Sequence, residues 1–84
     1  MPSERELARL RWQCRRGMLE LDEILLAYLE RHYATAAAAE QAAFRCLLGE
    51  ENPQLQRWLL LDERPADARL HALVEHLRRL TPAD

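Results

Sequence analysis

Apolar residues recur at intervals of three and four positions in five short segments of this chain, and helix-breaking or helix-capping residues separate the segments. This spacing places the apolar side chains of each segment on one face of an α-helix. Half of the 84 residues are Leu, Ala or Arg, which form helices readily, whereas Val, Ile and Thr, which favour strands, are scarce. The sequence therefore predicts an all-α protein, a compact five-helix bundle, with helices over residues 3–14, 18–33, 36–48, 53–62 and 65–80.

The joints between the expected helices carry residues that start or end helices. The expected starts are Ser3 with Glu6, Thr35, Asn52 with Pro53, and Pro65 with Asp67, and the expected ends are Gly17, Gly49, and Thr81 with Pro82. Connections of two to five residues favour helices that pack as antiparallel neighbours. Because a chain of this length has room for one hydrophobic core, we expect residues 1–84 to form a single domain.

Residues that carry enzyme chemistry are sparse in this sequence. Ser3 is the only serine and lies in an expected helix cap, so a serine nucleophile is excluded. No glycine-rich phosphate loop exists, because Gly17 and Gly49 are the only glycines. His71 and His76 are five positions apart, not the three or four that place two metal ligands on one helix face. We therefore expect neither an enzyme nor a metal protein.

Three further residues have an expected place relative to the core. Cys14 and Cys46 both fall on core-facing stripes, so we expect two buried thiols that behave as small apolar side chains. A disulfide or a metal site is the minor alternative. Trp12 lies off the centre of the stripe of the first helix, and we expect it to pack at the edge of the core.

The charge pattern limits the classes of partner. The formal net charge is −2, and the 12 arginines are spread among 14 acidic residues without a basic stripe, so we expect no binding to nucleic acid. The apolar segments are shorter than the 18 or more residues of a membrane span, so we expect no membrane insertion. The charged N-terminal residues lack the apolar core of a signal peptide, which favours a bacterial cytoplasm over a mitochondrial precursor. We also expect a monomer.

The segment around the first glycine departs from an ordinary amphipathic helix. Its unusual residues are Arg15, Arg16, Gly17, Met18, Glu20 and Asp22. One interpretation is a helix turn whose arginines are solvated or pair with nearby acids. The other is a surface that recognises a protein, because a guanidinium presents a planar fork of donors and glycine removes a side chain that would obstruct a partner. Glu20 lies one turn after Arg16, and we expect an ion pair between them.

Three stretches of the sequence resemble the SdhE/YgfY family of succinate dehydrogenase assembly factors. Residues 11–22 include Arg-Gly-x-x-Glu, which is the hallmark of that family. Residues 52–59 are similar to its Asp-Pro-x-Leu-x-x-Trp-Leu motif, with Asn52 in place of the usual Asp, and Pro65-Ala66-Asp67 recurs before its last helix. The resemblance covers residues 9–79, and it departs from the family pattern mainly at the run Ala36–Ala39, which replaces a polar helix start.

The resemblance implies a five-helix fold and a role in attaching FAD covalently to the flavoprotein subunit of succinate dehydrogenase, and in bacteria also of fumarate reductase. It implies that the histidine that receives the flavin belongs to the partner and that this chain binds no cofactor stably. The family motif falls on Arg16, Gly17 and Glu20, which would bind the partner, with Arg15, Met18 and Asp22 as neighbours.

The mechanism that we expect is positioning. The chain would hold an immature flavoprotein with its flavin and histidine aligned and then dissociate. On this hypothesis, Arg16→Ala or Gly17→Arg leaves folding nearly intact and abolishes flavin attachment. Two alternatives remain open: an antitoxin that binds a membrane-associated toxin, as some members of the family are described, and a protein that binds FAD directly.

Overall fold

The computed structural model describes residues 2–80, which form five α-helices, one short 3-10 helix and no strand. The elements are α1 (Glu4–Gln13), α2 (Leu19–Arg31), η1 (Tyr33–Thr35), α3 (Ala38–Leu48), α4 (Asn52–Leu59) and α5 (Ala68–Arg79). The predicted all-α bundle is confirmed. None of the helices in this part of the chain combines the length and the apolar character needed to cross a bilayer.

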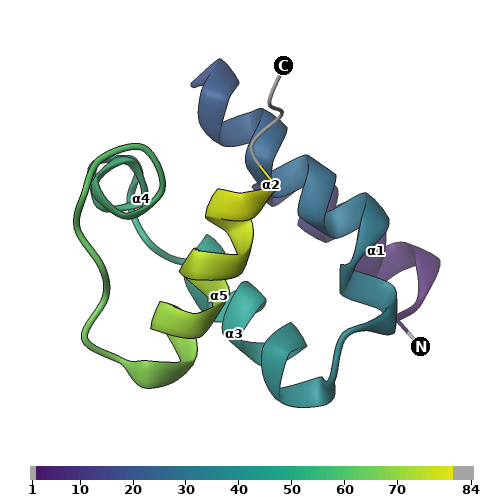
Figure 1. Ribbon diagram of the computed structural model, residues 1–84. Coiled ribbons are helices and arrows are strands. Elements are labelled where there is room, and N and C mark those ends of the chain that lie inside the picture. The colour runs from purple at the N-terminus through teal and green to yellow at the C-terminus, as the bar shows by residue number, and fades with distance from the viewer. Residues whose placement is uncertain (1, 81–84) are drawn as a thin grey trace.

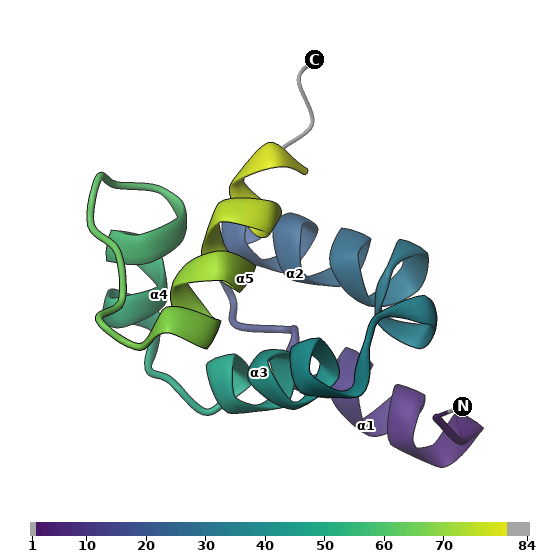
Figure 2. The ribbon, with the colours of Figure 1, turned by 60° about the horizontal axis from the view of Figure 1, so that its bottom comes forward.

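The last helix organises the packing. α5 packs against α2, α3 and α4, whereas α1 packs against α2, and Figures 1 and 2 show α5 between α4 and α2, with α3 beside it. The aromatic centre of the core consists of Tyr28, Tyr33 and Phe44, each fully buried, with the ring centroids of Tyr28 and Phe44 4.7 Å apart. The leucines of the predicted stripes surround these rings in one continuous apolar cluster. The burial of these stripes against each other accounts for the fold.

One of the four predicted helix starts is confirmed. The Ser3 side chain accepts a hydrogen bond of 3.1 Å from the backbone N–H of Glu6. The Glu6 carboxylate does not complete a capping box, because it accepts instead from the Tyr33 hydroxyl at 2.9 Å. At α5, the Asp67 carboxylate accepts from the backbone N–H groups of Arg69 and Leu70 and is the N-cap of that helix.

Three predicted helix starts are wrong. Thr35 belongs to η1, so α3 begins at Ala38 without any side-chain cap. The N-cap of α4 is Glu51, which makes Asn52 the first residue inside the helix. Pro65 does not open α5, because the Asp67 cap fixes its start three residues later.

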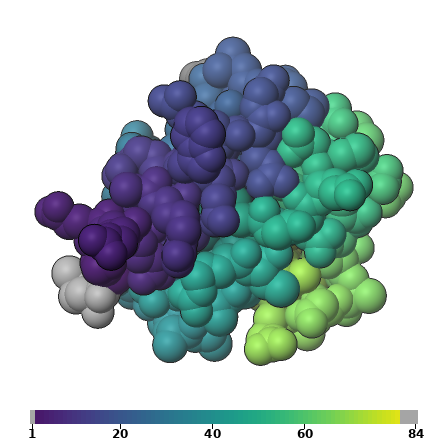
Figure 3. All heavy atoms as spheres, turned by 180° about the vertical axis from the view of Figure 1, so that it is seen from behind, coloured from purple at the N-terminus to yellow at the C-terminus, as the bar shows by residue number. Residues whose placement is uncertain are grey.

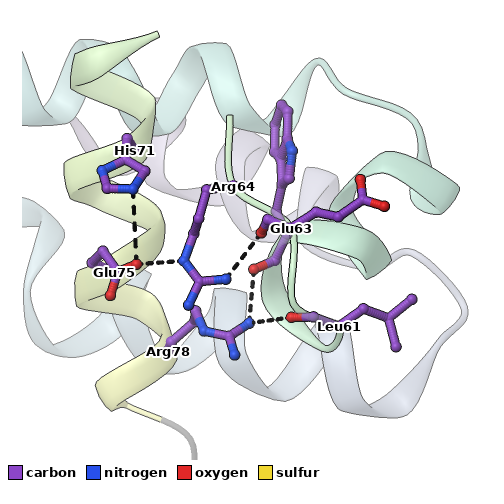
Figure 4. Close-up of polar contacts among 7 residues, drawn as sticks. Leu61, Glu63, Arg64, His71, Glu75 and Arg78 are labelled. Carbon is purple, nitrogen blue, oxygen red and sulfur yellow. Dashed lines mark hydrogen bonds and ion pairs between the residues drawn. The ribbon is translucent and has the colours of Figure 1, made fainter. Parts of the chain in front are cut away.

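The connection from α4 to α5 is held by two arginines. α4 ends at Leu59, earlier than predicted, and the Nη1 atom of Arg78 donates to the carbonyl oxygens of Trp58 at 2.9 Å and Leu61 at 2.7 Å. These bonds satisfy carbonyls at the helix end that have no partner within the helix. Arg64 pairs with Glu75 of α5, as Figure 4 shows. The predicted end of α5 at Thr81 and Pro82 lies outside the described residues.

The two thiols differ in exposure. Cys14, the C-cap of α1, is fully buried, and burial raises the pKa of its thiol to about 12. Cys46 is exposed, so the prediction of a second buried thiol is wrong. The buried face of α3 contains Phe44, Leu47 and Leu48, and position 46 points away from it. Neither thiol forms a disulfide.

Candidate functional site

The turn between α1 and α2, residues 15–18, contains a backbone conformation that favours glycine. Gly17 has φ +81°, and no other described residue has a positive φ. An L-residue in this left-handed region is disfavoured by about 1–2 kcal/mol. A Cβ built on Gly17 would meet no atom within 4 Å, so the space beside the backbone is open. The glycine is therefore needed for the shape of the turn, and it leaves the backbone accessible from outside.

The side chain of Arg16 points into the molecule and joins two helix ends. Its Nε donates to Oδ1 of Asn52 at 2.8 Å. Its Nη1 donates to the carbonyl oxygens of Leu48 at 2.9 Å and Gln13 at 3.1 Å, and its Nη2 donates to the carbonyl of Glu50. A cation is favourable at helix C-termini, where the last carbonyls are unpaired. Arg16 thus fastens the α1–α2 turn to the end of α3 and the start of α4.

The backbone of Arg16 is held as firmly as its side chain. Its N–H donates to Oδ1 of Asp22 at 2.8 Å, and its carbonyl accepts from Nδ2 of Asn52 at 3.1 Å. Among residues 2–80 no ion pair joins Arg16 to Glu20, so that prediction is wrong. The reason is that the guanidinium is occupied by partners more than 30 positions away. The expectation that Arg16→Ala leaves folding nearly intact is revised accordingly.

The exposed residues of this region surround the turn on its outer side. Trp12 and Leu19 are 71% and 73% exposed, which is unusual for side chains of this size. The remaining members of this surface, which we call the α1–α2 patch, are Arg15, Gly17 and Glu20, all exposed. In the described part of the chain, the Arg15 side chain has no hydrogen-bond or ion-pair partner.

The six predicted site residues therefore divide into two groups. Arg15, Gly17 and Glu20 face outward, whereas Arg16, Met18 and Asp22 are half-buried, with Met18 packed against the core. Sequence reasoning did not include Trp12 and Leu19 in the site, and the expectation that Trp12 packs at the core edge is wrong. A signal was present, since each is a large apolar residue that lies off the apolar stripe of its helix.

Two shallow hollows meet at Trp12. The larger, about 450 Å³, is lined by Trp12, Gln13, Arg15, Arg16, Glu51 and Asn52, and the smaller, about 300 Å³, is lined by Ala8, Arg11, Trp12 and Arg15. The larger hollow therefore includes residues from both the α1–α2 and the α3–α4 joints. Figure 3 shows the face of the molecule on which α1, in purple, and the dark blue segment that follows it adjoin the teal and green middle of the chain. An apolar indole beside unpaired arginine is suited to recognising another protein.

Elsewhere in residues 2–80, one further group of polar and titratable side chains lies together. A histidine pair, His32 and His76, has ring centroids 5.2 Å apart, with Nδ1 of His76 3.6 Å from the Glu40 carboxylate. Within residues 2–80, no group of three or more His, Cys, Asp and Glu side chains is arranged to hold a metal ion. Glu40 also accepts a hydrogen bond from the Tyr28 hydroxyl. The pKa of Tyr28 is raised mainly by burial of its hydroxyl and further by this hydrogen bond. These groups serve packing between α2, α3 and α5.

Comparison with known proteins gives consistent matches. The family described as "Flavinator of succinate dehydrogenase" matches residues 8–81. The FAD assembly factor SdhE of Pseudomonas aeruginosa is 42% identical over 74 residues, 88% of this chain and 88% of the relative. That of Xylella fastidiosa is 41% identical over 80 residues, 95% of this chain and 82% of the relative, and that of Haemophilus ducreyi is 33% identical over 70 residues, 83% and 85% of the two chains. No solved structure matches significantly. The chain belongs to the SdhE family of FAD assembly factors.

Proposed function

We propose that this chain binds the flavoprotein subunit of succinate dehydrogenase and promotes the covalent attachment of FAD to it. Membership of the SdhE family supports the activity and the class of partner. The exposure of Trp12 and Leu19, on either side of the Gly17 turn, indicates which surface of the chain binds the partner. Exposed large apolar side chains grouped beside charged ones are typical of a surface that another protein covers.

The α1–α2 patch acts by contact and not by chemistry of its own. Its members are an indole, an isobutyl side chain, a guanidinium, a carboxylate and a bare backbone, and none is an activated nucleophile or a general base. The two groups that become linked, the flavin and a histidine, both belong to the partner. This chain stabilises the partner conformation in which those groups are aligned and then dissociates, which is catalysis by positioning.

The chain itself holds no flavin between rounds in this proposal. The hollows beside Trp12 are shallow and open, whereas cofactor sites bury most of their ligand. Titration of the purified protein with FAD should leave the flavin absorption and fluorescence unchanged. A saturable spectral change would show a direct FAD-binding protein and contradict this part of the proposal.

The proposal also covers a second partner and the oligomeric state of the unbound chain. We include the flavoprotein subunit of fumarate reductase as a second partner, because the family resemblance of the sequence implies it. In this proposal, the unbound chain is a monomer in the bacterial cytoplasm. Its α1–α2 patch is exposed to solvent until the partner covers it. Sedimentation of the chain alone and in mixture with each flavoprotein subunit measures both features.

The test uses cells that lack the gene. Covalent flavin in the succinate dehydrogenase flavoprotein is measured by its fluorescence after denaturing electrophoresis, which removes flavin that is not linked. Deletion should abolish most of this fluorescence, and the intact gene should restore it. The variant Leu61→Ala, which removes an exposed apolar side chain from the α4–α5 connection, is the matched control and should restore it equally. Full covalent flavin in the deletion strain contradicts the proposed function, and capture of a membrane toxin without the flavoprotein favours the antitoxin alternative.

A further inference from the structure

We infer that Asn52 is a positioning residue of the partner-binding surface, which it serves by holding Arg16 and through it the Gly17 turn. The inference rests on the proposed function and deepens it. Asn52 lies 36 positions after Arg16, at the start of α4, and its side chain forms hydrogen bonds with both the side chain and the backbone of Arg16. The partner-binding surface is therefore built from two joints of the fold and not from the Arg-Gly-x-x-Glu segment alone.

The start of α4 explains why the Asn52 amide is available. Glu51 occupies the N-cap position, so the Asn52 side chain is not used to cap its own helix. Its Oδ1 accepts from Nε of Arg16 at 2.8 Å, and its Nδ2 donates to the Arg16 carbonyl at 3.1 Å. An amide can do both because it has a donor and an acceptor at one end. A carboxylate at this position accepts from the guanidinium but has no proton for the carbonyl.

The bonds of Asn52 complete the fixation of the turn. Both backbone polar groups of Arg16 are taken by side chains, the N–H by Asp22 and the carbonyl by Asn52. The next residue, Gly17, is the one with the left-handed backbone. Because the N–H and the carbonyl of Arg16 are both held, the neighbouring glycine has little freedom to change its backbone conformation. A glycine otherwise samples many conformations. The direction in which Arg15 and Leu19 leave the turn then depends on Asn52.

This arrangement gives Arg16 the same kind of role. Every donor nitrogen of its guanidinium has a partner within the chain. Such a group reaches a partner protein only by giving up these bonds, which costs free energy. Arg16 thus acts through the shape of the turn, and the unpartnered Arg15 supplies the cation that touches the partner.

The first measurement does not involve the partner. Cys14 is fully buried immediately before the turn, so its reaction with a thiol reagent reports local opening, and Cys46→Ala removes the exposed thiol that would mask the signal. In that background, Asn52→Ala should be compared with Asp67→Ala, which removes the N-cap of α5 and no contact with Arg16. At equal loss of global stability, Asn52→Ala should label Cys14 about tenfold faster than Asp67→Ala. Equal labelling rates would overturn the inference.

The second measurement is the affinity for the flavoprotein subunit of succinate dehydrogenase, at a temperature where every variant is folded. Asn52→Ala should raise Kd about tenfold, Asn52→Asp should raise it about threefold because it keeps the bond to Nε alone, and Asp67→Ala should leave it unchanged. An unchanged Kd for Asn52→Ala, or an equal rise for Asp67→Ala, would overturn the inference. Failure of the unsubstituted chain to bind would refute the proposed function instead, and the labelling of Cys14 would still decide the role of Asn52.

Discussion

Two joints of this protein are closed by the same device and differ in what they leave exposed. At the α1–α2 turn, Nη1 of Arg16 donates to the carbonyls of Gln13 and Leu48. At the α4–α5 connection, Nη1 of Arg78 donates to the carbonyls of Trp58 and Leu61, and Figure 4 marks the bond to Leu61 with a dashed line. In both places a guanidinium satisfies carbonyls at a helix end and ties two helices together.

The surroundings of the two joints are different. The α1–α2 turn contains a glycine with φ +81° and is flanked by the exposed Trp12 and Leu19. The α4–α5 connection has no positive φ, and its exposed large apolar residue is Leu61. An arginine bonded to helix ends therefore indicates a role in stabilising the fold and does not by itself indicate a binding surface. The accessible backbone and the uncovered apolar side chains are what distinguish a surface for a partner.

The largest expected effect comes from removing the two arginines. Arg16→Ala should lower the free energy of unfolding by about 3 kcal/mol, because it leaves several carbonyls without a partner, and Arg78→Ala should lower it by about 1–2 kcal/mol. Urea unfolding followed by far-ultraviolet circular dichroism measures both. Only Arg16→Ala should also weaken binding of the flavoprotein when compared where both variants are folded. Equal loss of binding in Arg78→Ala would break the distinction between the joints.

The next effect concerns the exposed apolar side chains. Trp12→Ala should weaken binding of the flavoprotein by about 2 kcal/mol, as is typical for a central interface tryptophan. Because the indole is exposed, the free energy of unfolding should change by less than about 0.5 kcal/mol. Leu61→Ala, at the other joint, should change neither quantity. Calorimetric titration with the flavoprotein measures the first effect, and a Trp12→Ala variant that binds normally would remove the α1–α2 patch from the proposal.

The third prediction separates the conformation of Gly17 from the space beside it. Gly17→Arg should cost about 1–2 kcal/mol of stability through its φ, whereas Gly17→Asn should cost less than about 1 kcal/mol because Asn tolerates the left-handed region. A Cβ at this position meets no atom within 4 Å in the free protein. Both should nevertheless block the partner, measured as loss of covalent flavin in the complementation assay. Normal flavin attachment with Gly17→Asn would mean that the turn matters for its shape alone.

Features that depend on neighbouring residues, such as helices and turns, could be predicted from the sequence. Side-chain contacts between residues far apart in the sequence could not. The helices followed from apolar spacing, and the turn at Gly17 followed from the place of a glycine between two helices. The capping role of Asn52 was wrong because its amide bonds to Arg16, 36 positions earlier. The ion pair from Arg16 to Glu20 failed for the same reason. Local patterns of residues do not show such contacts between distant positions. Trp12 is a different case, because its place off the apolar stripe of α1 already indicated that it would be exposed.

The smallest expected effect is a dependence of stability on pH at the α4–α5 connection. The backbone N–H groups of Leu70 and Arg69 hold the pKa of Asp67 below its ordinary value of 3.8. Since the pKa is lower in the folded state, this carboxylate stabilises the fold fully above pH 3.8 and progressively less as the pH falls through the folded value. The difference in unfolding free energy between the unsubstituted chain and Asp67→Asn should therefore shrink as the pH falls below about 4.

The Asp67→Asn variant keeps a side chain that can cap α5, so the comparison isolates the charge. Urea unfolding at each pH gives the difference directly. The labelling of Cys14 should respond to acid no more than global stability does in either protein, because the Asp67 cap lies at the other joint. If protonation of this carboxylate instead opened the α1–α2 turn selectively, the two joints would be coupled. The turn could then no longer be treated as a surface that is set only by its own contacts with Arg16, Asp22 and Asn52.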